Sequence, residues 1–183
     1  MSKLPPGELG EPYENAAPQE IVVEENKITM LSKRKLVVEA EKILEAALQE
    51  ARWLQQSLDT AMTAITEAIN NAVIHGCLRV REGASAPGYE TKVAEAEKKY
   101  GDIKHLYISY AITDTTIKVE IEDEGKKPFV PKGLPDPLAP KNLLKESGRG
   151  IMIMETIGTV SFTQGERGGT LVTLEIKKET QSA

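Results

Sequence analysis

The sequence has few of the residues from which disulfides, thiolate metal clusters and membrane spans are built. Its 183 residues include one cysteine, Cys77, so the chain can form neither an internal disulfide nor a thiol-based metal cluster. No apolar run approaches the roughly 18 residues that a membrane-spanning helix needs. The formal net charge is −5, which disfavours sequence-independent binding to nucleic acid or to anionic lipid. We therefore expect a cytoplasmic protein that binds neither nucleic acid nor membrane directly.

The composition is otherwise that of an ordinary soluble domain. Apolar residues make up 40% of the chain and charged residues 28%, and the length suits one domain with a full core. Residues 1–19 are rich in Pro, Gly and Glu and lack the apolar region of a signal peptide, which is typical of a disordered tail. We expect a single domain over residues 20–178, followed by a short tail at 179–183.

The first half of this domain is predicted to be mainly helical. Residues 20–31 are a strand candidate, and residues 32–57 place apolar side chains at helical spacing. A second helix is expected over about 58–75, ended by Gly76. Residues 79–104 are polar and punctuated by Gly and Pro, with a short charged helix near their end. We expect that this segment could be removed without exposing much of the core.

In the second half the apolar spacing changes from helical to alternating. Residues 105–123 and 159–178 each predict a β-hairpin, and residues 148–158 predict a glycine turn that runs into a short buried helix. Residues 126–147 hold five of the ten prolines, a density that neither a helix nor a central strand tolerates. The order predicts an α+β fold, a two-layer sandwich with a largely antiparallel sheet and helices on one face.

The stretch ITEAINNAVIHG, residues 65–76, carries an unusual number of polar side chains for a helix interior. They are Glu67, Asn70, Asn71 and His75. At 100° per residue, Glu67, Asn71 and His75 form a polar stripe beside the apolar one. A carboxylate can accept a proton and a carboxamide oxygen can bind a hard cation such as Mg²⁺. A solvated helix face with a frayed end is the alternative interpretation, because Asn favours caps and turns.

A second candidate group follows the first predicted hairpin. Asp123 comes directly after an alternating strand, where its carboxylate could accept a hydrogen bond from an amino group of a bound base. Gly125 would let a ligand approach the backbone. A simple strand-ending turn explains the same residues, because Asp and Gly both favour turns.

A third candidate group opens the predicted helix at 148–158. Gly148 and Gly150 would free backbone N–H groups to face an anion, and the helix dipole would add favourable charge. Lys141, Lys145 and Arg149 would supply cations nearby. An ordinary junction between a loop and a helix is the alternative.

The fourth candidate group lies in the last hairpin, at residues 165–170. The functional interpretation uses the hydroxyl of Thr170 at the base of a pocket, beside the acid at position 123. The alternative is a hairpin loop whose glycines adopt positive φ angles. Each group alone is weak evidence, and their order along the chain is the stronger signal.

The stretches EAINNAVIHG, EDEG, SGRGIMIM and GGTLVTL, in this order, resemble the N box and the three glycine boxes of the GHKL (histidine kinase-like) ATPase superfamily. This superfamily includes gyrase, histidine kinases and MutL and shares the Bergerat fold. Within it, TEAINNAVIHG and SGRGIMIMETIGTV are most similar to the anti-sigma factor serine/threonine-protein kinases of bacterial partner-switching systems. The resemblance covers about residues 21–178, apart from most of 79–104.

The resemblance implies a role for each matching residue of the first two stretches. Glu67 matches the glutamate that acts as general base, here toward a protein Ser or Thr hydroxyl. Asn71 matches the asparagine that binds Mg²⁺. Asp123 matches the aspartate that binds the adenine amino group of ATP, with Gly125 beside it.

The last two stretches carry the implied phosphate and lid functions. Gly148 and Gly150 match the phosphate-binding glycines, with Arg149 between them. Residues 126–147 correspond to the mobile ATP lid, and Thr170 matches the threonine near the adenine. Phosphoryl transfer needs positioning, a metal spanning phosphate oxygens and donors for developing charge, which agrees with each role.

The implied function is an ATP- and Mg²⁺-dependent serine/threonine kinase that acts as an anti-sigma factor. It would phosphorylate an anti-sigma factor antagonist and sequester a sigma factor or a similar target, as a homodimer. An alternative is a catalytically silent ATP-binding partner-switch module, because Glu146 stands where relatives often carry an arginine. The catalytic domain of a histidine kinase fits poorly, because the two histidines lie in the predicted nucleotide-binding helix and in an apolar strand. The segment 79–104 would be a partner-binding or regulatory addition.

Overall fold

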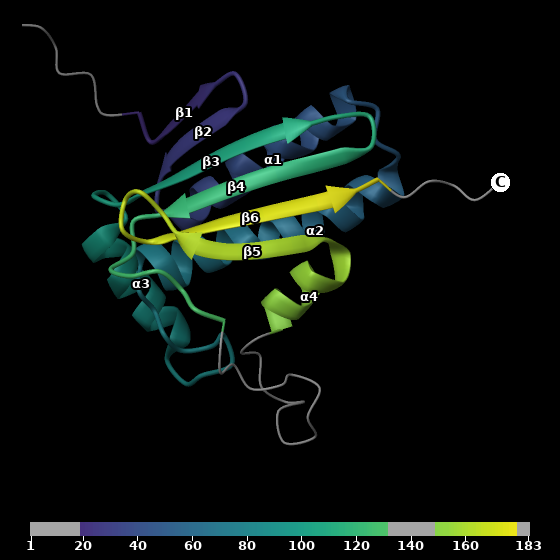
Figure 1. Ribbon diagram of the computed structural model, residues 1–183. Coiled ribbons are helices and arrows are strands. Elements are labelled where there is room, and N and C mark those ends of the chain that lie inside the picture. The colour runs from purple at the N-terminus through teal and green to yellow at the C-terminus, as the bar shows by residue number, and fades with distance from the viewer. Residues whose placement is uncertain (1–18, 132–148, 179–183) are drawn as a thin grey trace, which may run out of the picture.

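One antiparallel sheet with helices on one face forms the body of the computed structural model, which describes residues 19–131 and 149–178 (Figure 1). Within these residues the sheet has six strands in the order β1-β2-β3-β4-β6-β5. The strands are β1 (Ile21–Glu24), β2 (Lys27–Leu31), β3 (His105–Ile112), β4 (Thr116–Asp123), β5 (Thr159–Gln164) and β6 (Thr170–Lys177). The helices are α1 (Arg34–Glu50), α2 (Gln55–Asn71), the π-helix η1 (Ala72–Cys77), α3 (Tyr89–Tyr100) and α4 (Arg149–Ile157). The predicted α+β sandwich is confirmed.

The core lies between the sheet and the helices. Ile28, Ile108, Ile121 and Val172 form one row of register partners across β2, β3, β4 and β6, and all four are buried. The apolar stripes of α1 and α2 cover this face. The alanines Ala61, Ala64 and Ala68 of α2 are fully buried, and their small side chains allow close packing of that helix. Both predicted hairpins, β3–β4 and β5–β6, are confirmed, and they are joined through the pairing of β4 with β6.

The N-terminal part departs from the sequence prediction in two places. Residues 20–31 form the two strands of a hairpin, β1 and β2, because Glu25 at φ 46° turns the chain. The first helix ends at Glu50, and a new one starts at Gln55 after Arg52 at φ 57°. Neither turn contains the glycine or proline that usually marks such a break, so sequence spacing alone merged the elements.

The prediction that Gly76 ends the second helix is wrong. Helix α2 passes at Asn71 directly into η1, which continues to Cys77 and therefore contains Gly76. A π-helix hydrogen-bonds i to i+5 and is wider than an α-helix, and such segments occur frequently at functional sites. What Gly76 does there depends on its contact with β4, described below.

The segment 79–104 is more closely integrated than predicted. It folds into α3, whose Val93 is fully buried, and Val80 also belongs to the core. Removing the segment would therefore expose core residues, contrary to the sequence-based expectation. Along the stretches that the structure describes, no helix combines the length and the apolar character needed to cross a membrane.

Candidate functional site

Asp123 closes strand β4 and is surrounded by backbone. Only 2% of the residue is exposed, and its Oδ1 accepts a hydrogen bond from the Gly125 N–H at 2.7 Å. A Cβ atom added to Gly76 would lie 2.6 Å from Asp123 Oδ2, and one added to Gly125 would lie 2.6 Å from Oδ1. A Cβ atom on Gly169 would also overlap Asp123. Because no side chain fits at these three positions, main chain packs directly against the acid at Gly76, Gly125 and Gly169.

Burial raises the pKa of the Asp123 carboxyl above its ordinary value, and the nearby charge of Glu122 acts in the same direction. Hydrogen bonds from Gly125 and Thr170 to the carboxylate act in the opposite direction. Thr170 is itself buried, and its Oγ1 accepts the Phe129 N–H at 3.0 Å. Asp123, Gly125 and Thr170 thus lie together, and the Phe129–Thr170 hydrogen bond joins the chain after β4 to β6.

Glu67 and Asn71 lie one turn apart on α2, and both face the first turn of α4. A Cβ atom added to Gly150 would lie 2.5 Å from Glu67 Oε2 and 3.1 Å from Asn71 Nδ2. The first N–H groups of a helix have no partner within that helix, and they favour anionic groups. A carboxylate, a carboxamide and the N-terminal turn of α4 therefore meet at one place, which suits phosphate oxygens together with a hard cation.

One continuous helix joins the two groups. Glu67 and Asn71 belong to α2, and Gly76 belongs to η1, which follows without a break. The Glu67–Asn71 pair lies in the last turns of α2, and Gly76, which contacts Asp123, follows Asn71 by five residues on the same continuous helix.

His75 does not extend the polar stripe that the sequence predicts. It is exposed, and its Nδ1 lies 2.6 Å from the Val80 carbonyl oxygen. The stripe was derived from α-helical spacing, whereas residues 72–77 follow the wider π-helical spacing, so a residue four positions after Asn71 no longer lies above it.

Some predicted site residues cannot be placed. Lys141, Lys145 and Gly148 lie outside the described residues, as does most of the predicted lid at 126–147, and their roles stay predictions. Arg149 is exposed at the start of α4 and takes part in a further interaction. The sequence predicted Gly76 only as a helix end and gave no site role to Gly169. The signal for Gly169 was present, since it directly precedes Thr170 in the stretch GGT.

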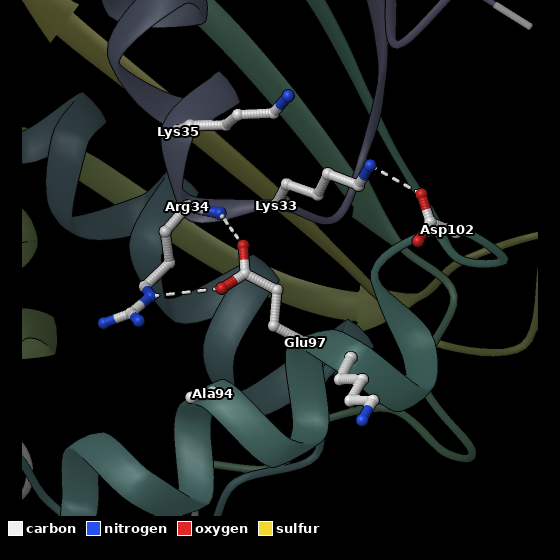
Figure 2. Close-up of a pocket in the computed structure, with 7 residues that line it drawn as sticks. Lys33, Arg34, Lys35, Ala94, Glu97 and Asp102 are labelled. Atoms are coloured by element: carbon white, nitrogen blue, oxygen red, sulfur yellow. Dashed lines mark hydrogen bonds and ion pairs between the residues drawn. The ribbon is translucent and has the colours of Figure 1, made fainter. Parts of the chain in front are cut away.

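A hollow of the described part of the chain lies elsewhere, between the start of α1 and α3 (Figure 2). It has a volume of about 530 Å³ and is lined by Lys33, Arg34, Lys35, Ala94, Glu97, Lys98 and Asp102. Arg34 N–H donates to Glu97 Oε1 at 2.7 Å, and Lys33 pairs with Asp102 at 2.5 Å. Its cations are largely matched by carboxylates, so this hollow is a junction between helices and not a site for an anion.

No group of three or more His, Cys, Asp or Glu side chains able to hold a metal ion is present within 19–131 and 149–178. A divalent cation bound to Asn71 would therefore take its remaining ligands from phosphate oxygens and water, the coordination that Mg²⁺ commonly adopts in nucleotide sites.

Comparison with protein families gives one match. The model of the histidine kinase-like ATPase domain matches residues 31–176, which run from the end of β2 into β6 and include every candidate site residue. A comparison with curated proteins finds no match.

Proposed function

The chain belongs to the histidine kinase-like ATPase domain family, and from this premise we propose that it is an ATP- and Mg²⁺-dependent protein serine/threonine kinase. Family membership implies that ATP is the ligand of the site. The substrate hydroxyl, the metal and the protein partners are the parts that we propose. The observation on which the proposal depends most is the meeting of Glu67, Asn71 and Gly150 beside the last turns of α2, whose continuation η1 contacts Asp123.

The residues around Asp123 fit a purine. A carboxylate accepts hydrogen bonds and can receive the exocyclic amino group of adenine. Main chain alone faces Asp123 from Gly76, Gly125 and Gly169, so a flat ring meets no side chain from these positions. Asn71 would contribute one oxygen ligand to Mg²⁺, with phosphate oxygens and water supplying the rest.

In the proposed reaction a Ser or Thr hydroxyl oxygen of the partner protein attacks the γ-phosphorus of ATP. The new O–P bond forms as the bond between the γ-phosphorus and the β–γ bridging oxygen breaks, and ADP leaves with that electron pair. Glu67 accepts the hydroxyl proton. Such transfers depend on positioning and charge stabilisation, which the first turn of α4 supports through its backbone N–H groups.

The proposed substrate is an anti-sigma factor antagonist, and the proposed second partner is a sigma factor or an equivalent target. What supports this finer assignment is the resemblance of residues 66–76 and 147–160 to anti-sigma factor kinases. We propose a cytoplasmic homodimer that holds the sigma factor until it exchanges that partner for the antagonist. Phosphorylation of the antagonist would reverse the exchange.

The test uses labelled ATP, Mg²⁺ and the antagonist encoded beside this chain. Glu67→Gln should retain ATP binding and lose phosphoryl transfer, because it removes the proton acceptor but not the purine site. Asp123→Asn should lose ATP affinity. Asp59→Asn is the matched control, an exposed carboxylate on the same helix as Glu67. Transfer by Glu67→Gln at the rate of the control would contradict the proposed base.

A second candidate is an ATP-binding switch module without catalysis. The observation that favours it is Glu146, at a position where relatives often carry an arginine. A ligand that binds one of two states more tightly shifts the population toward that state, so ATP could set partner affinity without any chemistry. This function requires that ATP changes sigma-factor affinity while no neighbouring protein becomes phosphorylated.

A further inference from the structure

Three consecutive acids, Glu122, Asp123 and Glu124, stand at the end of β4 and face different surroundings. Asp123 points toward η1, where Gly76 contacts it. Successive side chains of a strand point to opposite faces, so Glu122 and Glu124 lie on the face of the sheet away from that helix. Glu122 is nevertheless only 8% exposed. A carboxylate buried to this degree needs partners.

The partner of Glu122 is the loop between β5 and β6. Arg167 N–H donates to Glu122 Oε1 at 2.7 Å, and the Arg167 guanidinium forms an ion pair with Oε2. The guanidinium also stacks over the ring of Tyr107, with 3.8 Å between Cζ and the ring centroid. A Cβ atom added to Gly165 would lie 2.6 Å from Glu122 Oε1, so this end of the loop also rests on Glu122.

The contacts continue to the segment that follows Asp123. Tyr107 Oη donates to Glu124 Oε1 at 3.0 Å, and Glu124 Oε2 accepts the His105 N–H at 3.1 Å. Glu124 lies between Asp123 and Gly125 in the chain. Both neighbours of the acid in β4 are therefore anchored on the opposite face of the sheet.

The same β5–β6 loop ends at Gly169 and Thr170, which contact Asp123 from the other side. We propose that Glu122 and Arg167 are positioning residues of the nucleotide site: they hold this loop against Asp123, and Arg167 offsets the negative charge that Glu122 places beside it. The inference rests on the proposed nucleotide binding at Asp123. It adds to that proposal a pair of residues that would not touch the nucleotide.

The charge of Arg167 should shift the pH dependence of ATP binding, and a purely structural contact would not do so. Burial is the main cause that raises the pKa of Asp123, and the charge of Glu122 adds to it. Arg167 is the cation paired with Glu122, so removal of the Arg167 charge leaves the charge of Glu122 uncompensated. Directly after β4 the other charged neighbour is Glu124, which contacts Tyr107 and His105 and pairs with Lys104 at 3.9 Å. From η1 the ionisable neighbour is Cys77, and burial raises its pKa to about 11, which keeps it neutral. From β6 and β3 the neighbours are Thr170 and Leu106, which do not titrate.

The experiment measures ATP dissociation constants by calorimetry across a pH series, with Mg²⁺ present. Wild type should lose affinity as Asp123 becomes protonated. Arg167→Met should weaken binding on the order of tenfold and move the pH midpoint upward. Arg167→Lys should restore the midpoint, because it restores the charge. Glu122→Gln should move the midpoint in the opposite direction, downward.

The matched control is the ion pair between Lys118 and Glu120, 2.7 Å apart on the same strand and the same face. Lys118→Met and Glu120→Gln should leave both affinity and midpoint unchanged. Equal midpoints for wild type and Arg167→Met, or a shift in Lys118→Met as large as that in Arg167→Met, would overturn the inference while leaving the proposed function intact.

Two further outcomes separate the proposals. Wild-type protein that binds no ATP at any pH would overturn the proposed function itself. If Arg167→Met does not fold, carboxyl NMR of Asp123 in Glu122→Gln decides the question without nucleotide. A lowered titration midpoint supports the positioning pair, and an unchanged midpoint overturns it.

Discussion

Gly76 of the π-helix and Asp123 of β4 are in direct contact, since a Cβ atom on Gly76 would lie 2.6 Å from Asp123 Oδ2. This contact fixes the acid relative to Asn71, five residues earlier on the same helix. The π-helical segment and the glycine thus serve one purpose. They bring main chain against the buried carboxylate while the polar residues of α2 remain aligned toward α4.

Gly76→Ala should weaken ATP binding although alanine is the better helix former. In a helix interior alanine is more favourable than glycine by about 1 kcal/mol, so helix propensity alone predicts a gain in stability. The added methyl group displaces Asp123, and we expect ATP affinity to fall by about tenfold or more, measured by calorimetry. In the double variant Gly76→Ala/Asp123→Ala the overlap is gone, so thermal stability should recover while ATP binding does not. Wild-type affinity in Gly76→Ala would show that the contact does not position the acid.

Asp123 should contribute a pH dependence to the free energy of unfolding. Burial raises the pKa of its carboxyl above the ordinary 3.8, so the folded chain holds this proton more tightly than the unfolded chain does. The free energy of unfolding contains no penalty from Asp123 while the group is protonated in both states. It falls as pH rises from 3.8 through the folded pKa and then stays level.

Asp123→Asn removes this penalty. Its unfolding free energy, measured by urea denaturation at several pH values, should therefore exceed that of wild type by an amount that grows through the same window. Asp59→Asn, which alters an exposed carboxylate, is the matched control for the removal of a carboxyl group. Parallel curves for Asp123→Asn and wild type would show that burial does not penalise the charged form.

The fold was predictable where sequence spacing is sufficient. The alternation of Ile117, Val119 and Ile121 identified β4, and the same pattern identified β6, because a half-buried strand has a period of two. Element boundaries failed where the chain turns without glycine. Glu25 and Arg52 adopt positive φ, which nothing in their residue types announces.

The sequence was sufficient to predict which motifs form the candidate site, but not which of their residues contact one another. Glu67, Asn71 and Asp123 could be singled out from their types and places in the chain. The sequence contains no local signal for a π-helix, so the contact of Gly76 with Asp123 could not be foreseen. Arg167 was missed for a similar reason: its pairing with Glu122 joins residues far apart in sequence, and such a pairing follows from strand order.

The junction in Figure 2 gives a prediction about stability that is separate from nucleotide binding. Helix α1 has no side-chain cap from its own N-cap residue, Lys33, and the N–H of Arg34 instead donates to Glu97 Oε1 of α3 at 2.7 Å. Glu97→Ala should lower the free energy of unfolding by about 1 kcal/mol, as the loss of a helix cap does. Because Glu97 also pairs with the Arg34 guanidinium, the loss should be larger at low salt.

Denaturant unfolding at two salt concentrations measures this effect, and ATP binding should remain at the wild-type value because Glu97 does not contact the site residues. Glu95→Ala is the matched control, since Glu95 is an exposed glutamate on the same helix. Equal losses of stability in both variants would mean that the cap contributes nothing beyond the general effect of removing a glutamate from α3. A loss in Glu97→Ala alone would show that α3 stabilises the start of α1. The same helix also packs into the core through Val93 of the segment 79–104.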